Sequence, residues 1–315
     1  MRVFVTGASG WIGSATVDEL LDAGHEVTGL ARSDASASRL EAKGVTVLRG
    51  DLDDLASLRA GSADAEAVIH LANKHDWANP AESNRAERAA VQTIGDVLAG
   101  SDRPFLLASG VAGLAPGRPS TENDRAPWSG PDAPRGGAEN LALDYVEKGV
   151  RSISLRFAPT VHGDGDRGFI ALIVAAARAR GLSGYVADGC TGWAAVHRSD
   201  AARMVRLGLE KAPGGALLHA VGEGSVSNKA IADAIGRGLD LPTDSIAPED
   251  AQEHFGFIGT FFAMDLASSS TITQEVLGWT PTGPTLLEDL DSGSYFRRLA
   301  SRTLVQLCRR QTCRP

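Results

Sequence analysis

The stretch Thr6-Gly7-Ala8-Ser9-Gly10-Trp11-Ile12-Gly13 decides the fold of this chain. It follows a short apolar run, 2–6, that is typical of a strand, and it opens a segment with helical periodicity, 11–23. Glycines at this spacing allow a sharp turn, a close approach of the backbone to a pyrophosphate, and close packing of a helix on a sheet. The helix N-terminus adds free N–H groups and a positive dipole end. The whole stretch, Thr6 to Gly13, therefore predicts a dinucleotide-binding loop.

Strand-like and helix-like segments alternate on both sides of this loop. The strand-like segments are 2–6, 25–32, 45–52, 65–72, 104–109, 152–157, 194–196 and 216–221. The helix-like segments are 11–23, 86–99, 137–148, 169–180, 200–210, 226–236 and 285–299. This alternation predicts an α/β fold with a Rossmann-type, doubly wound parallel sheet.

The expected domain organisation has two parts and a tail. Residues 1–158 and 187–221 are expected to form the dinucleotide-binding domain, and residues 159–186 and 222–300 a smaller substrate-capping region. Residues 115–134 are rich in Pro, Gly and Ser and predict a long functional loop. Residues 301–315 carry several arginines and no acidic residue, and we expect them to be a disordered basic tail.

The composition excludes several function classes. The 315 residues carry a net charge of −8, which argues against a nucleic-acid binder, and 43% of them are hydrophobic, which argues against a disordered chain. The longest apolar run, 169–177, is too short to cross a membrane. Three cysteines and no visible signal peptide predict a cytoplasmic protein without disulfides. The histidines show no spacing typical of metal ligands, so no metal is expected.

The end of the second strand bears on which dinucleotide is bound. A carboxylate there binds the ribose 2′-hydroxyl of NAD, but this chain has Arg32 and Ser33, which suit the 2′-phosphate of NADP. Asp34 is a competitor that keeps NAD as the less favoured alternative. At the end of the third strand Asp51, beside Leu52, is placed to accept from the adenine amino group or to start a helix.

Further motifs resemble one family, the extended or atypical short-chain dehydrogenase/reductases with an epimerase/dehydratase-like sequence. These motifs are Val68-Ile69-His70-Leu71-Ala72, Leu155-Arg156-Phe157-Ala158-Pro159-Thr160-Val161-His162-Gly163, Trp193-Ala194-Ala195-Val196-His197-Arg198-Ser199-Asp200 and Leu277-Gly278-Trp279-Thr280-Pro281. The resemblance covers residues 1 to 300. It implies a Rossmann domain with a capping domain, cofactor contacts at Leu71 and Ala72, and a homodimer.

The catalytic motif of that family is where the sequence departs. The family uses a serine or threonine after the fifth strand, which Ser109 matches, and a Tyr-x-x-x-Lys on the next helix, which is absent. Alignment on Glu139 puts Arg135 at the lysine position and Pro131 at the tyrosine position. Arg135 suits a ribose or phosphate anchor, but its pKa is too high for a proton donor. The resemblance leaves the tyrosine's role without a residue.

His75, His162 or a water molecule remain as candidate proton donors, because imidazole exchanges protons near neutral pH. Trp77, Trp128 and Trp193 are the candidate substrate contacts. A cluster of apolar residues either lines an apolar substrate pocket or packs in a core: Phe255, Phe257, Phe261, Phe262 and Met264.

The leading hypothesis is therefore an NADP-dependent oxidoreductase. It would transfer a hydride between the nicotinamide and a small organic carbonyl, imine or related double bond, with Ser109 at the substrate oxygen. One alternative is an epimerase or dehydratase that retains its NAD. The other is a nucleotide-sensing protein without turnover, which the missing tyrosine favours.

Overall fold

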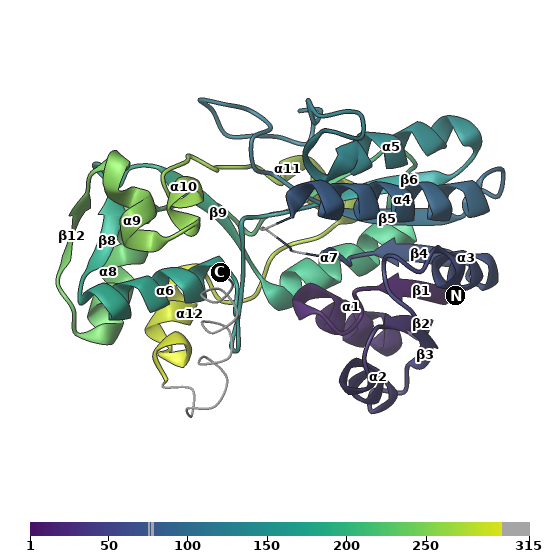
Figure 1. Ribbon diagram of the computed structural model, residues 1–315, viewed down its shortest axis with the longest axis horizontal. Helices are drawn as coiled ribbons and strands as arrows, with labels where there is room; N and C mark the ends of the chain where they lie inside the picture. Colours follow the sequence, from purple (N-terminus) through teal and green to yellow (C-terminus); the bar gives the residue numbers. More distant parts are fainter. Residues whose placement is uncertain (75, 77–78, 298–315) are drawn as a thin grey trace, which may run out of the picture.

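A seven-stranded parallel sheet forms the larger lobe of the computed structural model, which describes residues 1–74, 76 and 79–297 (Figure 1). The strand order is β10-β6-β5-β4-β1-β2-β3, and every neighbouring pair in it is parallel. The strands are β1 (Arg2–Thr6), β2 (Glu26–Ala31), β3 (Thr46–Arg49), β4 (Ala67–His70), β5 (Pro104–Gly110), β6 (Arg151–Phe157) and β10 (Leu217–Ala220). The predicted Rossmann-type fold class is confirmed.

Helices cover both faces of this sheet because its strands bury side chains on both faces. In β1 the alternate residues Val3 and Val5 belong to one hydrophobic core, and Phe4 between them belongs to another. The first core includes side chains of α1 (Trp11–Asp22), α2 (Asp34–Glu41), α7 (Arg198–Lys211) and α11 (Thr271–Leu277). The second includes α3 (Leu55–Asp64), α4 (Pro80–Leu98) and α5 (Ala138–Asp144).

The direction of strand order reverses at β1, which lies between β2 and β4. In open α/β sheets ligands bind outside the carboxyl ends of the strands at such a switch point. The ends of β1, β4 and β5 therefore mark where a site is expected.

A smaller lobe lies beyond those carboxyl ends, at the left of Figure 1. It holds a three-stranded sheet, β11-β9-β7, and a two-stranded sheet, β12-β8. Its strands are β7 (Thr160–His162), β8 (Ser183–Val186), β9 (Gly192–His197), β11 (Glu223–Ser227) and β12 (Thr243–Ile246). Its helices are α6 (Phe169–Arg180), α8 (Asn228–Leu239), α9 (Ala251–Phe255), α10 (Ile258–Phe262) and α12 (Leu286–Asp291). Apart from β7, whose Val161 packs against the first core of the larger lobe, these elements share a core of their own.

Three expectations about elements need correction. Strand β9 falls in 187–221, which we expected in the large sheet, but it pairs with β7 and β11 instead. The segment 226–236 begins as strand β11, and the helix starts only at Asn228, where the Ser227 hydroxyl caps it by accepting from Ala230 N–H. The predicted helix 285–299 ends at Asp291, because Gly293 takes a left-handed conformation with φ of +80°.

No helix among the described residues is long and apolar enough to span a membrane. The predicted basic tail, 301–315, lies outside the described residues.

Candidate functional site

The glycine loop leaves no room for side chains at two of its positions. Gly7 has φ of +70°, and a Cβ atom there would lie 2.7 Å from the backbone nitrogen of Ala72 at the exit of β4. A Cβ on Gly13 would lie 2.1 Å from the carbonyl oxygen of Gly7. Both distances are far below van der Waals contact, so the loop can adopt this path only with glycine at both positions.

The first turn of α1 presents unpaired backbone donors. Its N-cap, Gly10, supplies no side-chain hydrogen bond, and the first turn holds no acidic residue. Gly10 N–H donates to Gly7 O at 2.8 Å, but the N–H groups of Trp11, Ile12 and Gly13 have no acceptor among the described residues. Three free donors at the positive end of a helix, beside the half-buried Ser9, fit a pyrophosphate.

The Trp11 side chain turns away from this phosphate site and contacts the smaller lobe. Its Nε1–H donates to the carbonyl oxygen of Val161 at 2.7 Å. The Arg198 guanidinium lies 4.3 Å from the ring centre and donates to the Trp11 carbonyl at 2.7 Å. Trp11 therefore joins the glycine loop to the smaller lobe.

The exit of β2 places an unpaired cation beside a paired carboxylate. Arg32 is exposed and has no partner among the described residues. Asp34, the competitor that would favour NAD, forms an ion pair with Arg49 at 2.8 Å. The Ser33 hydroxyl caps α2 by accepting from Ser36 N–H. Net positive charge therefore remains at the position that distinguishes a 2′-phosphate from a 2′-hydroxyl.

At the end of β3, the contacts of Asp51 fit a local turn before α3, which is the simpler of its two predicted roles. Asp51 Oδ1 accepts N–H groups of Asp53 and Asp54 at 2.9 and 3.1 Å, which is a local turn, and Leu52 is buried. The second carboxylate oxygen of Asp51 has no described partner, so contact with adenine stays a prediction.

A buried polar path runs from the end of β1 to helix α4. Thr6 Oγ1 lies 2.8 Å from His70 Nδ1 and also accepts Ala72 N–H at 3.3 Å, next to Leu71. His70 Nε2 lies 3.9 Å from Glu87 Oε1. His70 is fully buried, and that burial lowers its pKa, so the imidazole is neutral at pH 7.

Arg135 contacts the end of this polar path at Glu87. Its guanidinium lies 2.6 Å from Glu87 Oε1, and Glu87 Oε2 accepts from the Asn73 amide at 3.1 Å. Arg135 has φ of +54°, and its backbone N–H donates to Asn84 Oδ1 at 2.8 Å. The residue at the family's lysine position thus has a carboxylate partner, and its role as a ribose or phosphate anchor stays a prediction.

Ser109, at the end of β5, is joined to a second buried ion pair. Its hydroxyl donates to Glu139 Oε2 at 2.7 Å, while Arg156 donates to Glu139 Oε1 at 2.7 Å. Arg156 has no exposed surface and also contacts the carbonyl of Asp124 and His219 Nε2. The Ser109 hydroxyl therefore donates to a carboxylate. Only the lone pairs of its oxygen remain, and these can accept a hydrogen bond from a ligand.

The three tyrosines of the chain are all described, and each contacts residues other than Ser109. Tyr145 donates to Asp96 at 2.6 Å beneath helix α4. Tyr185 lies in β8 with Lys229 near its ring, and Tyr295 donates to Asp166 at 2.9 Å. None of the three tyrosine hydroxyls is hydrogen-bonded to Ser109.

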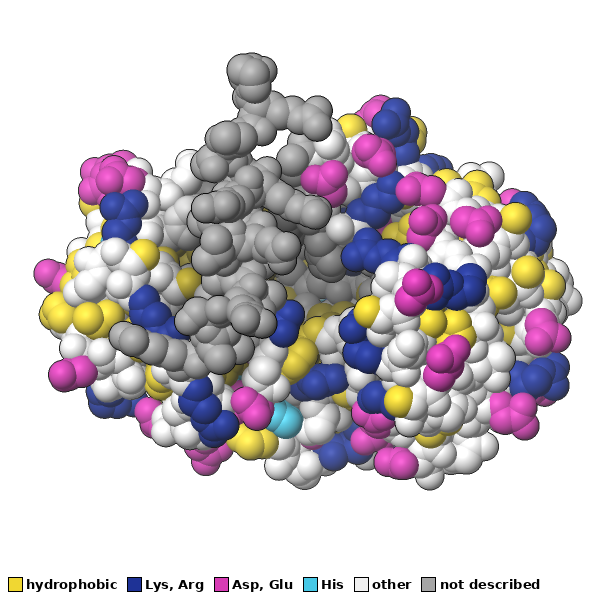
Figure 2. Space-filling model, turned by 60° about the horizontal axis from the view of Figure 1, so that its bottom comes forward, with side chains coloured by type: hydrophobic (Ala, Val, Ile, Leu, Met, Phe, Trp, Pro, Cys, Tyr) yellow, Lys and Arg dark blue, Asp and Glu magenta, His cyan; other side chains and the backbone are white. Residues whose placement is uncertain are grey.

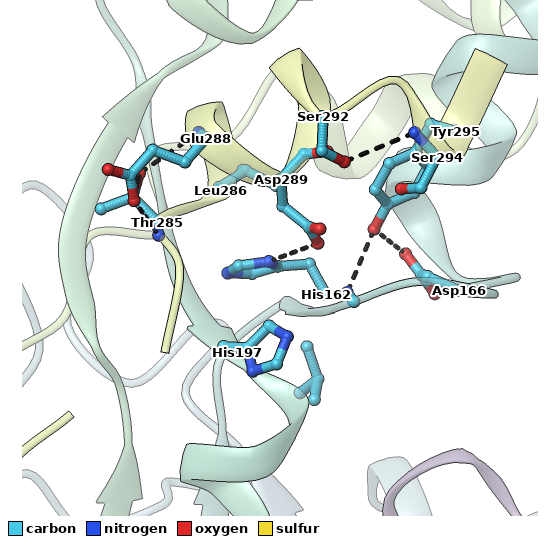
Figure 3. Close-up of polar contacts among 12 residues, drawn as sticks. His162, Asp166, His197, Thr285, Leu286, Glu288, Asp289, Ser292, Ser294 and Tyr295 are labelled. Carbon is cyan, nitrogen blue, oxygen red and sulfur yellow. Dashed lines mark hydrogen bonds and ion pairs between the residues drawn. The ribbon is translucent and has the colours of Figure 1, made fainter. Parts of the chain in front are cut away.

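His162 is corrected as a candidate proton donor. Its side chain has no exposed surface, and its Nδ1 lies 3.0 Å from Asp289 Oδ2 (Figure 3). The ring meets that of His197 edge to face at 5.5 Å. A fully enclosed ring cannot reach a ligand in a solvent-filled cleft. His75 lies outside the described residues and stays a candidate.

Among the tryptophans, Trp193 is corrected. It has no exposed surface and packs against Phe169 and Phe262, so its ring is part of the core of the smaller lobe. Trp128 is half-buried and covers Gly113, and Trp77 lies outside the described residues. Their contact with a substrate stays a prediction.

Some members of the apolar cluster pack in a core, and others are exposed as residues of a pocket wall would be. Phe255 and Phe262 are buried in the core, whereas Phe257 and Met264 are 44% and 40% exposed. Exposed apolar surface of this kind suits a ligand wall more than a core.

The surface is hollowed between the two lobes, and Lys and Arg side chains gather along the right side of the hollow in Figure 2. Within the described residues no three His, Cys, Asp or Glu side chains gather as metal ligands would. Positive charge beside a hollow suits an anionic ligand.

Sequence reasoning missed the carboxylates that organise the site. Glu87 lies in a helix predicted only from periodicity, and nothing in its neighbours marks it as buried. The alignment on Glu139 does not reveal its partners, because Ser109 and Arg156 lie 30 and 17 positions away in the sequence. Asp289 lies in a segment expected to be plain helix.

Comparison with known proteins agrees with this geometry. A family model described as the NAD dependent epimerase/dehydratase family matches residues 3–218. The uncharacterized protein C2A9.02 of Schizosaccharomyces pombe is 44% identical over 297 residues, which cover 94% of this chain and 100% of that protein. A 4-hydroxy-2-methyl-3-oxo-4-farnesyl-3,4-dihydroquinoline-1-oxide ketoreductase of Stigmatella aurantiaca is 28% identical over 225 residues, or 68% of this chain and 66% of that protein.

Among solved structures, a double mutant of DesIV from Streptomyces venezuelae, a dTDP-glucose 4,6-dehydratase with NAD and DAU bound, has the same fold. Its TM-score is 0.75 with 20% identity, and the match covers 95% of this chain and 97% of that one.

Proposed function

The chain belongs to the NAD dependent epimerase/dehydratase family, and from that premise we propose that it is an NADP-dependent oxidoreductase. It transfers a hydride between the nicotinamide and a small organic carbonyl, imine or related double bond. The ketoreductase relative supports this reaction class. A bound nicotinamide supplies the hydride donor or acceptor, and the chain supplies binding, orientation and proton transfer.

The observation that carries the choice of NADP is the exit of β2. Arg32 is exposed and without a described partner, whereas Asp34 is neutralised by Arg49 at 2.8 Å. A planar guanidinium binds a phosphate monoester through paired hydrogen bonds, and a carboxylate already in an ion pair competes poorly for a ribose hydroxyl.

The remaining roles follow from the edge of the sheet. The free N–H groups of Trp11, Ile12 and Gly13 bind the pyrophosphate. Ser109 orients the substrate oxygen, and Arg135 lies near the ribose while its charge is balanced by Glu87. His75 or a water molecule exchanges the proton, because no tyrosine is placed to do so.

A nucleotide-binding protein without turnover is the second candidate. Ser109 and Arg135, the two matches to the catalytic pattern, are both hydrogen-bonded to buried carboxylates, Glu139 and Glu87. A site whose polar groups are satisfied internally has less to offer a reacting substrate.

Titration of the purified protein with NADPH and NADH, followed by nicotinamide fluorescence, tests the proposal. Selective NADPH binding, followed by NADPH oxidation with members of a carbonyl and imine panel, supports the oxidoreductase. Selective binding without oxidation across the panel favours the second candidate. NAD that remains bound through purification would contradict the NADP assignment and favour an epimerase or dehydratase mechanism.

A further inference from the structure

The segment that contains α12 and the turn after it contacts the loop between β7 and α6 through two polar pairs (Figure 3). Asp289 on α12 accepts from His162 Nδ1 at 3.0 Å. The Tyr295 hydroxyl donates to Asp166 Oδ2 at 2.9 Å and accepts the Gly163 N–H at 3.5 Å. We call these four residues, His162, Asp166, Asp289 and Tyr295, the C-terminal latch.

The latch is partly buried and joins distant parts of the sequence. His162 and Asp289 are buried, whereas Asp166 and Tyr295 are half-buried, and desolvation raises the pKa of Asp166. More than 120 residues separate the partners of each pair, so the contacts exist only when α12 is docked. Hydrogen bonds to carboxylates in such surroundings are stronger than exposed ones and hold one geometry.

The loop that the latch holds lies against the glycine loop. Val161, beside His162, accepts the indole N–H of Trp11 at 2.7 Å. A Cβ on Gly163, which has φ of +153°, would lie 3.4 Å from both the Trp11 ring and His197. Gly165 is also near this ring. The residues held by Tyr295 and Asp289 therefore form one wall around Trp11.

Trp11 connects this wall to the phosphate site, because its backbone N–H belongs to the first turn of α1. From this chain of contacts we infer that Asp289 and Tyr295 are positioning residues for the dinucleotide site: they hold residues 162–168 against Trp11 and so keep the first-turn donors ordered. This inference rests on the proposed function for the identity of the ligand. The ordering of the first-turn N–H groups by the latch does not depend on that function.

The test uses the full chain with Tyr295→Phe, Asp166→Ala and the double variant. Tyr185→Phe is the matched control, because Tyr185 lies in the same lobe and has no described hydrogen bond through its hydroxyl. Hydrogen exchange of the ligand-free protein is measured for peptides covering 9–16 and 161–168. The dissociation constants of NADPH and NADH, and the free energy of unfolding, are measured on the same variants.

We expect Tyr295→Phe and Asp166→Ala each to raise exchange in both peptides at least about threefold, and to weaken NADPH about fivefold to tenfold, the scale of a modest coupling between sites. The double variant should weaken NADPH by less than the two single effects combined, since both variants remove the Tyr295–Asp166 bond. Tyr295→Phe also removes the acceptor of Gly163 N–H, and Asp166→Ala also removes the acceptor of Gly168 N–H. Tyr185→Phe should change neither quantity. A purely structural role would lower the free energy of unfolding while leaving exchange of 9–16 and the dissociation constant unchanged.

The inference is overturned if hydrogen exchange of peptide 9–16 is unchanged in Tyr295→Phe and Asp166→Ala. If the parent chain binds NADPH, an unchanged NADPH affinity in these variants also overturns it. If the parent binds neither dinucleotide while exchange in the variants rises, the latch's ordering role is supported and the proposed function fails. The two failures are thus distinguishable.

Discussion

Arg135 and Glu87 form an ion pair of 2.6 Å in which the arginine side chain is 37% exposed and the carboxylate side chain only 1% exposed. The two partners therefore depend on the pair to different degrees. Arg135 can turn towards water if Glu87 is removed, but Glu87 has no such escape. Its other described contacts are the Asn73 amide and, at a distance, His70.

We therefore expect Arg135→Ala to destabilise the fold by about 3 kcal/mol at pH 7.5, the cost of leaving a buried charge without its partner. The loss comes from the buried carboxylate of Glu87, which keeps its contact with the Asn73 amide but has no cation beside it in this variant.

Urea unfolding at pH 7.5 measures this, and Glu87→Gln/Arg135→Met is the matched control. The double variant removes both charges and should recover most of the loss. A double variant as unstable as Arg135→Ala would show that Glu87 does not depend on Arg135.

His70 gives a prediction about the pH dependence of stability. Burial lowers its pKa in the folded protein, so below about pH 6.5, the usual pKa of histidine, the unfolded chain binds a proton that the folded protein excludes. Stability is then lost as pH falls, by at most about 1.4 kcal/mol per pH unit for one proton.

The His70→Asn variant should lose less stability than the parent between pH 7 and 5, measured by urea unfolding. His219→Asn is the comparison, since the pKa of that buried histidine is also lowered by burial. Identical pH slopes for the parent and His70→Asn would mean that His70 takes up its proton while folded.

The sequence was a good guide to the large sheet, and particular residues show why. Val3, Phe4 and Val5 are continuously apolar because both faces of β1 are covered, and the glycine spacing admits few alternatives. The smaller lobe was poorly predicted because its strands are short and its pairings are set by tertiary contacts. Strand β11 shows this best, since its residues read as the start of a helix.

The residues of the candidate site also differ in how well the sequence predicts them. The sharp turn predicted at Gly7 and the close packing predicted at Gly13 are confirmed, since Gly7 has φ of +70° and a Cβ atom on Gly13 would lie 2.1 Å from the Gly7 carbonyl oxygen. Residues whose role depends on a distant partner could not be assigned. His162 is an example, because only the fold brings Asp289, 127 positions away, to its ring.

Gly13→Ala tests the steric requirement of the glycine loop. A Cβ at 2.1 Å from the Gly7 carbonyl oxygen forces that turn to move, so we expect a loss of about 2–4 kcal/mol of stability, as for other severe local strain. Dinucleotide binding should be lost as well. Gly214→Ala is the control, because a Cβ there meets nothing closer than 3.6 Å. Tight NADPH binding by Gly13→Ala would show that the loop tolerates another path.

Arg32→Ala tests cofactor choice. Loss of a guanidinium–phosphate contact costs about 1.5–3 kcal/mol, which is roughly a 10- to 150-fold weaker NADPH complex, while NADH binding should change less than about threefold. Fluorescence titration with both dinucleotides measures this. Arg59→Ala, an exposed arginine on α3 without a described partner, is the matched control for the change in net charge. Equal losses for NADPH and NADH in Arg32→Ala would remove Arg32 from its assigned position.

Ser109→Ala tests the proposed contact with the substrate oxygen against a purely structural hydroxyl. The Ser109 hydroxyl donates to Glu139 Oε2 at 2.7 Å, and Glu139 keeps its pair with Arg156 when that hydroxyl is removed, so we expect a stability loss of about 1 kcal/mol. If the oxygen orients the substrate, kcat with an accepted carbonyl should fall about 10- to 100-fold while the NADPH dissociation constant stays unchanged. Ser152→Ala in β6, a buried serine with an unpaired hydroxyl, is the control and should leave kcat unaltered. A Ser109→Ala variant with parental kcat would assign the hydroxyl to the Glu139–Arg156 pair alone, and the search for the group that orients the substrate would move to Arg135 and the residues after β4.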